Sequence, residues 1–151
     1  MRHHRLWRYG PLVLWATLIF IGSTDVLSAS NTGGIILRPV LWLFPHLGAG
    51  KLKIFQFVGR KAGHFTEYAI FALLAARAFR TSSRELLRNR WFWASLLLVI
   101  AYAASDEFHQ SFVPSRTGSI YDSMIDSLGG LTALVLLALK RGKKPSQDLH
   151  D

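Results

Sequence analysis

The side chains best suited to chemistry lie in a polar run over residues 105–126, which separates two of the most hydrophobic stretches of the chain. Five of its ionisable side chains lie beside or inside those apolar stretches: Asp106, Glu107, Arg116, Asp122 and Asp126. Carboxylates can act as general bases or metal ligands, and an arginine fork binds phosphate or carboxylate groups. Because ionisable groups are costly in a lipid-embedded segment, this placement favours a functional site.

Helical spacing arranges the candidate residues in three stripes, because residues three or four positions apart share a helix face. The first stripe consists of Lys61, His64 and Tyr68, with Glu67 beside it. The second consists of Asp106 and Gln110, next to Glu107. The third begins acidic and ends small, with Asp122, Asp126, Gly129 and Ala133. The small pair at its end would let this helix approach a neighbour closely and hold the carboxylates against the bundle interior.

The composition places the chain in the membrane class. A chain of 151 residues is normally one domain, and a hydrophobic fraction of 50% with a mean hydropathy of +0.24 is unlike that of an ordinary soluble protein. The absence of cysteine excludes disulfides, thiolate metal sites and cysteine nucleophiles. We therefore expect an all-α, polytopic membrane helix bundle.

Four apolar segments are the expected transmembrane helices: residues 9–22, 62–79, 91–104 and 120–139. Each reaches the length of about 20 residues that a span needs only if its polar shoulder joins the helix. The third segment could extend back into the turn before Trp91 or forward through Glu107. A capping box of Ser82 and Glu85 favours an early start for this helix, and Ser119 with Asp122 forms a second box before the fourth.

A fifth apolar stretch, residues 35–47, contains Pro39 and Pro45, which break helices. We therefore expect a re-entrant or interfacial segment around residues 35–58 instead of a further span. The N-terminus allows a second interpretation, because its basic start and apolar core resemble a signal peptide with a cleavage site at residues 27–29. Asp25 and Leu27 make a poor cleavage site by the small-residue rule, so four spans are preferred to three.

Basic residues are concentrated on one side of the expected spans. They number twelve against three acidic residues there, a difference of nine that equals the whole net charge of +9. The twelve are Arg2, Arg5, Arg8, Arg77, Arg80, Arg84, Arg88, Arg90, Lys140, Arg141, Lys143 and Lys144. The excess of lysine and arginine in cytoplasmic loops predicts that both termini lie inside, with residues 140–151 as a basic tail, and it explains the charge without a nucleic-acid partner.

This topology brings the three stripes to one level. The second span would enter the membrane from the outer side, the third would leave it there, and the fourth would enter again after Arg116. The polar residues would then lie within the first or last two turns of three neighbouring helices. The sequence thus predicts a single polar site near the outer face of the membrane.

Each candidate also has an ordinary structural explanation. Asp122 could cap its helix, and Glu67 could be interfacial, with Lys61 extending to the lipid headgroups. His64 could be a buried core histidine, although carboxylates on the facing helices would make its charge adjustable. Asp126 lies one turn deeper than Asp122, where capping does not account for it.

The motifs as a set resemble the VanZ-like family of bacterial membrane proteins. They are Lys61-x-x-His64-x-x-x-Tyr68, Asp106-Glu107-x-x-Gln110-x-Phe112-x-Pro114-x-Arg116 and Asp122-x-x-x-Asp126-x-x-Gly129. A glycine often closes the family pattern where this chain has Ala133. The resemblance implies a small polytopic protein of the bacterial cytoplasmic membrane, with residues 1–139 as the VanZ-like domain. The namesake is associated with resistance to teicoplanin, whereas many relatives have no resistance role.

Three functions are compatible with these residues. In the first, Arg116 with Lys61 and His64 binds an anionic envelope component, such as a lipid phosphate or a cell-wall precursor, and the acids orient the cations. In the second, the protein is a membrane hydrolase or transferase. Ser115 and Arg116 match the spacing of a lipid phosphatase motif, but Asp122 replaces its nucleophilic histidine.

The third function is metal-dependent chemistry, for which His64, Glu67 and the acids of the polar run offer nitrogen and oxygen ligands. Arg116 and Lys61 can already neutralise those acids, so no cofactor is expected. Membrane lipids, and a lipid-linked or cell-wall precursor, are the expected partners. The oligomeric state stays open.

Overall fold

The computed structural model describes residues 2–24, 42–43, 48–113 and 119–142. Its helices are α1 (Arg2–Ser23), α3 (Ala49–Arg80), α4 (Glu85–Asn89), α5 (Trp91–Gln110) and α6 (Ile120–Gly142), and these described ranges contain no strand. The predicted all-α class is confirmed. The four long helices contain the four apolar segments of the sequence, each extended at one or both ends by polar residues.

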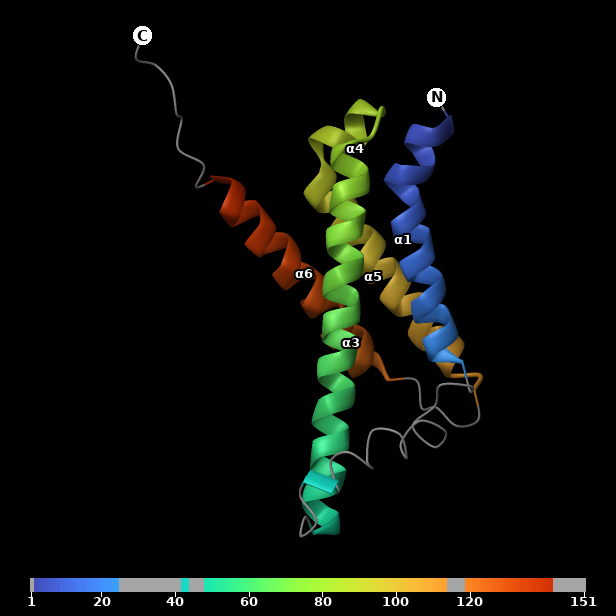
Figure 1. The fold of residues 1–151 in the computed structure, drawn as a ribbon, viewed down its shortest axis with the longest axis vertical. Helices are drawn as coiled ribbons and strands as arrows, with labels where there is room; N and C mark the ends of the chain where they lie inside the picture. Colours follow the sequence, from blue (N-terminus) through green and yellow to red (C-terminus); the bar gives the residue numbers. More distant parts are fainter. Residues whose placement is uncertain (1, 25–41, 44–47, 114–118, 143–151) are drawn as a thin grey trace.

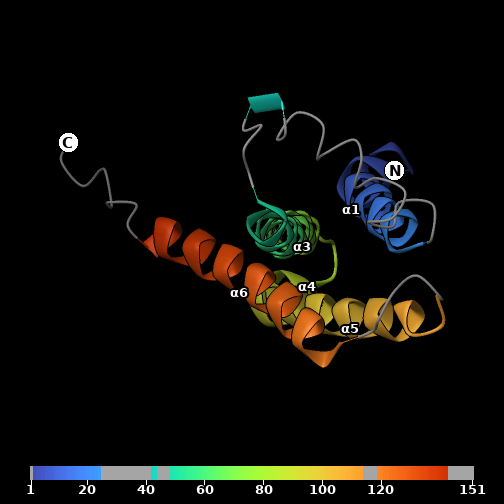
Figure 2. The same cartoon turned by 90° about the horizontal axis from the view of Figure 1, so that it is seen from below.

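The four long helices alternate in direction along the chain (Figure 1). The start of α1, the end of α3, the short helix α4 and the end of α6 lie toward one end of the molecule. The end of α1, the end of α5 and the start of α6 lie toward the other. Helix α3 is central, because it contacts α1, α5 and α6, and Figure 2 shows α1 beside α3 with the α5–α6 pair below them.

Small residues allow the close packing of α6. A side chain at Gly129 would collide with the backbone carbonyl of Phe65 on α3, and one at Gly130 would lie 2.6 Å from a methyl group of Val99 on α5. Ala133 follows one turn later and is buried. The predicted role of the Gly129 and Ala133 pair is therefore confirmed, and alanine at position 133 still permits a close approach.

Hydrogen bonds attach α1 to the other helices. The indole N–H of Trp15 donates to the backbone carbonyl of Glu67 at 2.9 Å, and the Tyr102 hydroxyl donates to the carbonyl of Ala16 at 2.6 Å. Near the other end, the hydroxyls of Tyr9 and Ser82 are 3.0 Å apart and share a hydrogen bond. These contacts fix α1 against both α3 and α5.

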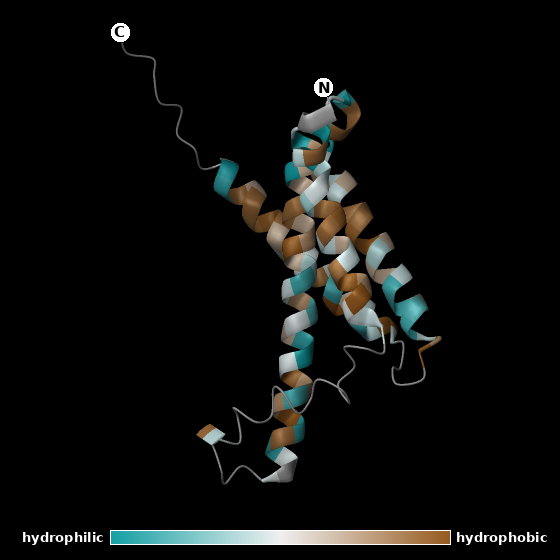
Figure 3. Cartoon of the chain, turned by 45° about the vertical axis from the view of Figure 1, so that its right-hand side comes forward, coloured by the Kyte–Doolittle hydropathy of each residue, from teal (hydrophilic) through white to brown (hydrophobic). Residues whose placement is uncertain are grey.

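Large apolar side chains are exposed on the outward faces of all four long helices. They include Leu14, Leu18, Leu73, Trp93, Leu97, Leu136 and Leu139. Figure 3 shows hydrophobic residues along the helices, with hydrophilic residues near the start of α1. Among the described residues, α6 is the one helix that is long and apolar enough, by length and composition, to cross a membrane.

Two sequence-based expectations are corrected. Residues 49–58 do not belong to a separate re-entrant or interfacial segment, since they form the first part of α3, which has 32 residues and extends past the other helices in Figure 1. Residues 35–41 and 44–47 lie outside the described part. At the expected rise per residue α3 is about 48 Å long, so it exceeds the roughly 30 Å hydrocarbon core of a bilayer.

The early start of the third span was also wrong. The Ser82 hydroxyl accepts a hydrogen bond from the backbone N–H of Arg84 at 3.1 Å, and Glu85 begins the separate five-residue helix α4. Arg90 then adopts a non-helical conformation, and α5 begins at Trp91. The helix of the third apolar segment gains its length at its other end, where α5 continues through Glu107 to Gln110.

Candidate functional site

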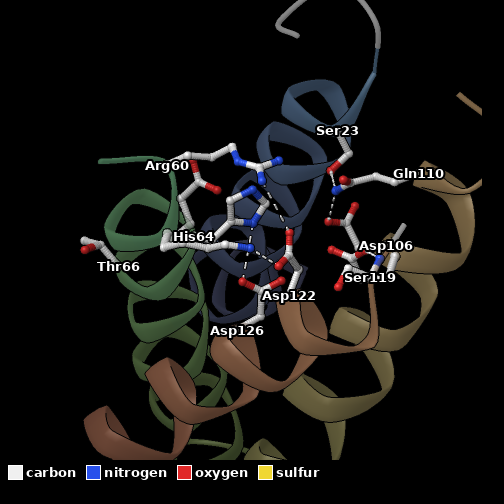
Figure 4. A network of polar contacts seen from close by, with 12 residues as sticks. Ser23, Arg60, His64, Thr66, Asp106, Gln110, Ser119, Asp122 and Asp126 are labelled. Atoms are coloured by element: carbon white, nitrogen blue, oxygen red, sulfur yellow. Dashed lines mark hydrogen bonds and ion pairs between the residues drawn. The ribbon is translucent and has the colours of Figure 1, made fainter. Parts of the chain in front are cut away.

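Polar side chains of α3, α5 and α6 meet where the last turns of α5 and the first turns of α6 pass the middle of α3 (Figure 4). Six of these residues are buried: Tyr68, Asp106, Glu107, Gln110, Asp122 and Asp126. Two of them, Tyr68 and Asp126, have no exposed surface. The three stripes of the sequence therefore lie together at one level, as the topology predicts.

Asp122, in the first turn of α6, pairs with cations of α3. Its carboxylate accepts a short hydrogen bond from the ammonium of Lys61, and the guanidinium of Arg60 is 4.0 Å away. The carboxylate side chain is 7% exposed, whereas Lys61 is 18% and Arg60 39% exposed. A buried acid thus positions two cations that reach the surface.

Asp126, one turn further into α6, faces His64 of α3. The Nδ1 atom of His64 lies 3.4 Å from a carboxylate oxygen of Asp126, a distance that suits an ion pair when the imidazole is protonated. In the described part of the chain, neither the Nδ1 atom nor either carboxylate oxygen makes a hydrogen bond, so the contact is an ion pair without hydrogen-bond geometry. The atoms of this pair can therefore still form hydrogen bonds with another group.

Asp106 and Gln110, one turn apart on α5, connect the site to α1. The side-chain amide of Gln110 donates to a carboxylate oxygen of Asp106 at 3.0 Å and to the hydroxyl of Ser23 at 3.3 Å. Ser23 is buried at the end of α1. The predicted second stripe is present, and it continues to a fourth helix that sequence spacing did not include.

Glu107 joins the end of α5 to the start of α6. One of its carboxylate oxygens accepts the backbone N–H of Ser119 at 2.7 Å, and the other has no hydrogen-bond partner. This contact satisfies a free N–H group at the helix start, which an Asp122 side chain in a capping box would otherwise do. Asp122 is thus available to pair with Lys61.

Three predicted residues differ in their placement. Tyr68 lies within the site near Asp106 and Asp126, and its hydroxyl makes no hydrogen bond with the described residues. Glu67 is exposed on α3, and its charge acts on His64 from the edge of the site. Arg116 lies outside the described residues.

Sequence reasoning missed two contributors, Arg60 and Ser23. Both adjoin predicted features, since Arg60 precedes Lys61 and Ser23 ends the first apolar segment. Ser23 could have been found as the polar residue at the outer end of the first expected span. Two other histidines could be compared with His64: His46 lies outside the described residues, and His109 packs against Phe20 with a ring-centroid distance of 4.8 Å.

The described residues include no group of three or more histidine, aspartate or glutamate side chains arranged to hold a metal ion. Their carboxylates face cations, amides and backbone N–H groups instead. The cluster therefore presents two partly exposed cations at its edge and several hydrogen-bond acceptors in its interior.

Comparison with known families identifies the class of protein. The chain matches the VanZ/LLP1 family over residues 9–141, which include α3, α4 and α5, most of α1 and α6, and the whole described polar cluster. The chain therefore belongs to the VanZ/LLP1 family, and the predicted resemblance is confirmed. Neither a curated protein nor a solved structure matches it.

Proposed function

We propose that the chain is a multi-pass integral protein of the bacterial cytoplasmic membrane, in which α1, the second part of α3, α5 and α6 are the four spans. The exposed apolar side chains of these helices support the proposal, because a lipid-facing surface is apolar. Their alternating directions place the start of α1 and the end of α6 on one side, together with most of the basic residues. By the positive-inside rule that side is cytoplasmic.

In this orientation residues 1–139 form the membrane domain and residues 140–151 a cytoplasmic basic tail. The polar cluster then lies toward the outer leaflet. Ionisable groups at that depth are expensive, and they mark binding sites more often than structural contacts. The family namesake's association with glycopeptide resistance is consistent with a role at the cell envelope.

The site binds an anionic lipid or a cell-wall precursor through its cations. The observation that carries this proposal is the pair of Lys61 and Arg60, which are partly exposed and are held by the buried carboxylate of Asp122. Two cations that converge on one oxygen acceptor can also converge on a phosphate at the same place. Arg116 adds a third cation to this chemistry by its position in the sequence.

Binding of phospholipid to purified protein tests this function. Native mass spectrometry should show retained phospholipid on the wild-type protein and about tenfold less on Lys61→Ala, because hydrogen bonds to a charged group are the strong ones. Lys53→Ala is the matched control, since Lys53 is an exposed lysine of the same helix. Equal retention by both variants and the wild type would contradict the proposal.

The His64 and Asp126 pair supports a second function, hydrolysis or group transfer on a lipid-linked substrate. A histidine 3.4 Å from a buried carboxylate is a proton carrier beside a fixed partner, as general acid–base catalysis requires. Release of phosphate or sugar from lipid-linked substrates by the purified protein, and its loss in His64→Gln, would establish this activity. No release from any such substrate would leave binding as the function.

A further inference from the structure

We infer that the interior of the site binds an ammonium group, so that the preferred ligand is a phosphate ester carrying a primary amine. The inference rests on the proposed function, because it assigns the phosphate to Lys61 and Arg60. It adds a second subsite formed by Glu107, Asp126 and Tyr68. The nearest source of such a ligand is an ethanolamine phospholipid of the surrounding bilayer.

The first observation is a set of buried acceptors without donors. Within the described residues, both carboxylate oxygens of Asp126 and one of Glu107 accept no hydrogen bond, and the hydroxyl of Tyr68 makes none, although one Asp126 oxygen is ion-paired with His64. Asp126 and Tyr68 are fully buried, and Glu107 is 7% exposed. Buried polar groups are nearly always hydrogen-bonded, so several orphaned acceptors in one place indicate a missing donor.

The second observation is where the described cations lie. Lys61 and Arg60 both lie at Asp122, whereas His64 faces Asp126 at 3.4 Å. Within the described residues, the hydrogen bonds that Asp106 and Glu107 accept come from the Gln110 amide and from a backbone N–H, which are neutral donors. Among these described residues, the three interior acids Asp106, Glu107 and Asp126 therefore share one histidine, while Asp122 at the edge has two cations, and incompletely compensated buried charge is destabilising.

These acids also lie close together. The charge of Glu107 interacts with those of Asp106, Asp122 and Asp126. In Figure 4, Asp106 and Asp126 lie on opposite sides of Asp122's carboxylate, between His64 and Gln110. A single cation placed among them would reduce the repulsion of the whole group.

An ammonium group matches this subsite better than the alternatives. It supplies a positive charge and three N–H donors, against three unpartnered carboxylate oxygens. A sugar or glycerol hydroxyl donates a hydrogen bond but carries no charge. A trimethylammonium group carries the charge but has no N–H donor, and its methyl groups would leave the carboxylate oxygens unpaired.

Three phospholipids that share their acyl chains and phosphate separate these alternatives. They are phosphatidylethanolamine, phosphatidylcholine and phosphatidylglycerol, each added to delipidated full-length protein in detergent and quantified by native mass spectrometry. We expect about tenfold tighter binding of phosphatidylethanolamine than of the other two, because the charged hydrogen bonds form with this headgroup alone. Soluble phosphoethanolamine as a competitor tests whether the headgroup suffices without the lipid.

Variants of the two subsites keep the two proposals distinguishable. Glu107→Gln and Asp126→Asn should abolish the preference for phosphatidylethanolamine while the binding of phosphatidylglycerol persists. Lys61→Ala should weaken all three lipids. Equal binding of the three lipids by the wild type, with all three weakened in Lys61→Ala, would overturn the ammonium subsite and leave the phosphate site intact. No effect of Lys61→Ala on any lipid would overturn the proposed function itself.

Misfolding of Glu107→Gln or Asp126→Asn would not be mistaken for loss of the ammonium subsite. Each of these two variants is compared across three lipids on the same preparation, so a damaged protein loses all three, whereas a lost ammonium subsite removes one preference. His109→Gln serves as a further control, because His109 is a titratable neighbour on α5 that packs against Phe20 instead of the acids. It should keep the wild-type preference.

Discussion

The two halves of α6 differ in how closely they pack and in whether their polar groups are paired. Around Gly129 and Gly130 the helix lies directly against the backbone of Phe65 and the side chain of Val99, with no space for a methyl group. One turn earlier, α6 presents the carboxylate of Asp126 to the same two helices. Neither oxygen of this carboxylate accepts a hydrogen bond from the described residues. One helix therefore carries a close-packed segment and an unsatisfied one within a few residues.

The difference shows how the fold keeps an unfavourable site in place. Tight interior packing has few alternative arrangements, so the small-residue segment fixes the position of α6 relative to α3 and α5. The acids are then held where their mutual repulsion would otherwise separate the helices. Unsatisfied buried groups persist when the surrounding structure over-determines them, and such groups mark functional sites.

The largest effect is expected from Gly129→Ala. Its Cβ atom would overlap the backbone carbonyl of Phe65, which cannot move without shifting α3. Overpacking of this kind costs about 3 kcal/mol of unfolding free energy. Unfolding in mixed micelles, followed by circular dichroism, measures the loss.

Gly63→Ala is the matched control for that substitution, because nothing lies within 4 Å of the Cβ position at Gly63. Alanine is the better helix former by about 1 kcal/mol, so this variant should be no less stable than the wild type. Equal destabilisation by both alanines would show that α6 does not depend on a close contact at Gly129.

The close-packed half of α6 and the convergence of the polar residues could be predicted from sequence, because both depend on local periodicity. Helical geometry and charge asymmetry were enough to predict three features. These are the close approach at Gly129 and Ala133, the three stripes and the alternating direction of the helices. Pairing across helices was not predictable in this way. The choice of Glu107 over Asp122 as the acceptor for the Ser119 N–H depends on how α5 ends against α6.

Helix ends were the least predictable part for the same reason. Pro39 and Pro45 oppose a helix through residues 35–47 by their chemistry, a prediction that falls mostly outside the described residues, and nothing local fixes where the next helix begins. The structure has α3 starting at Ala49, which absorbs residues assigned to a separate segment. Similarly, Ser82 and Glu85 have the spacing of a capping box, yet Ser82 bonds to Arg84 and Tyr9 instead.

The next largest effect is expected at the charged half, from Lys61→Ala. The variant leaves the carboxylate of Asp122, 7% exposed, with Arg60 at 4.0 Å as its remaining described cation. Removing one partner of a largely buried ion pair should cost about 2 kcal/mol, somewhat less than for a fully buried pair, because Lys61 is 18% exposed.

The double variant Lys61→Ala with Asp122→Asn tests the cause of that loss. It should be more stable than Lys61→Ala alone, since the uncompensated charge is gone. The same unfolding assay gives both values. Additive losses would mean that the two residues act independently.

A smaller effect is expected from Tyr102→Phe, which removes one hydrogen bond between α5 and α1 and leaves both halves of α6 unchanged. The Tyr102 hydroxyl donates to the carbonyl of Ala16 on α1, and its ring packs against Phe71 with centroids 4.9 Å apart. Phenylalanine keeps the ring contact and loses the hydrogen bond, which should cost about 1 kcal/mol. Tyr121→Phe, at an exposed tyrosine of α6, should be neutral in the same assay.

The smallest effect has the opposite sign and distinguishes the two halves most directly. In Glu107→Gln the amide oxygen can still accept the Ser119 N–H, while the amide N–H₂ replaces an unpartnered carboxylate oxygen beside Asp126. The variant should be about 0.5 kcal/mol more stable than the wild type, because one buried charge is removed from a cluster of acids. Substitutions in the close-packed half should not raise the free energy of unfolding, because that half contains no buried charge that a substitution could remove. A less stable Glu107→Gln would mean that this carboxylate supports the fold, and the unsatisfied half of α6 would then need a structural explanation in place of a functional one.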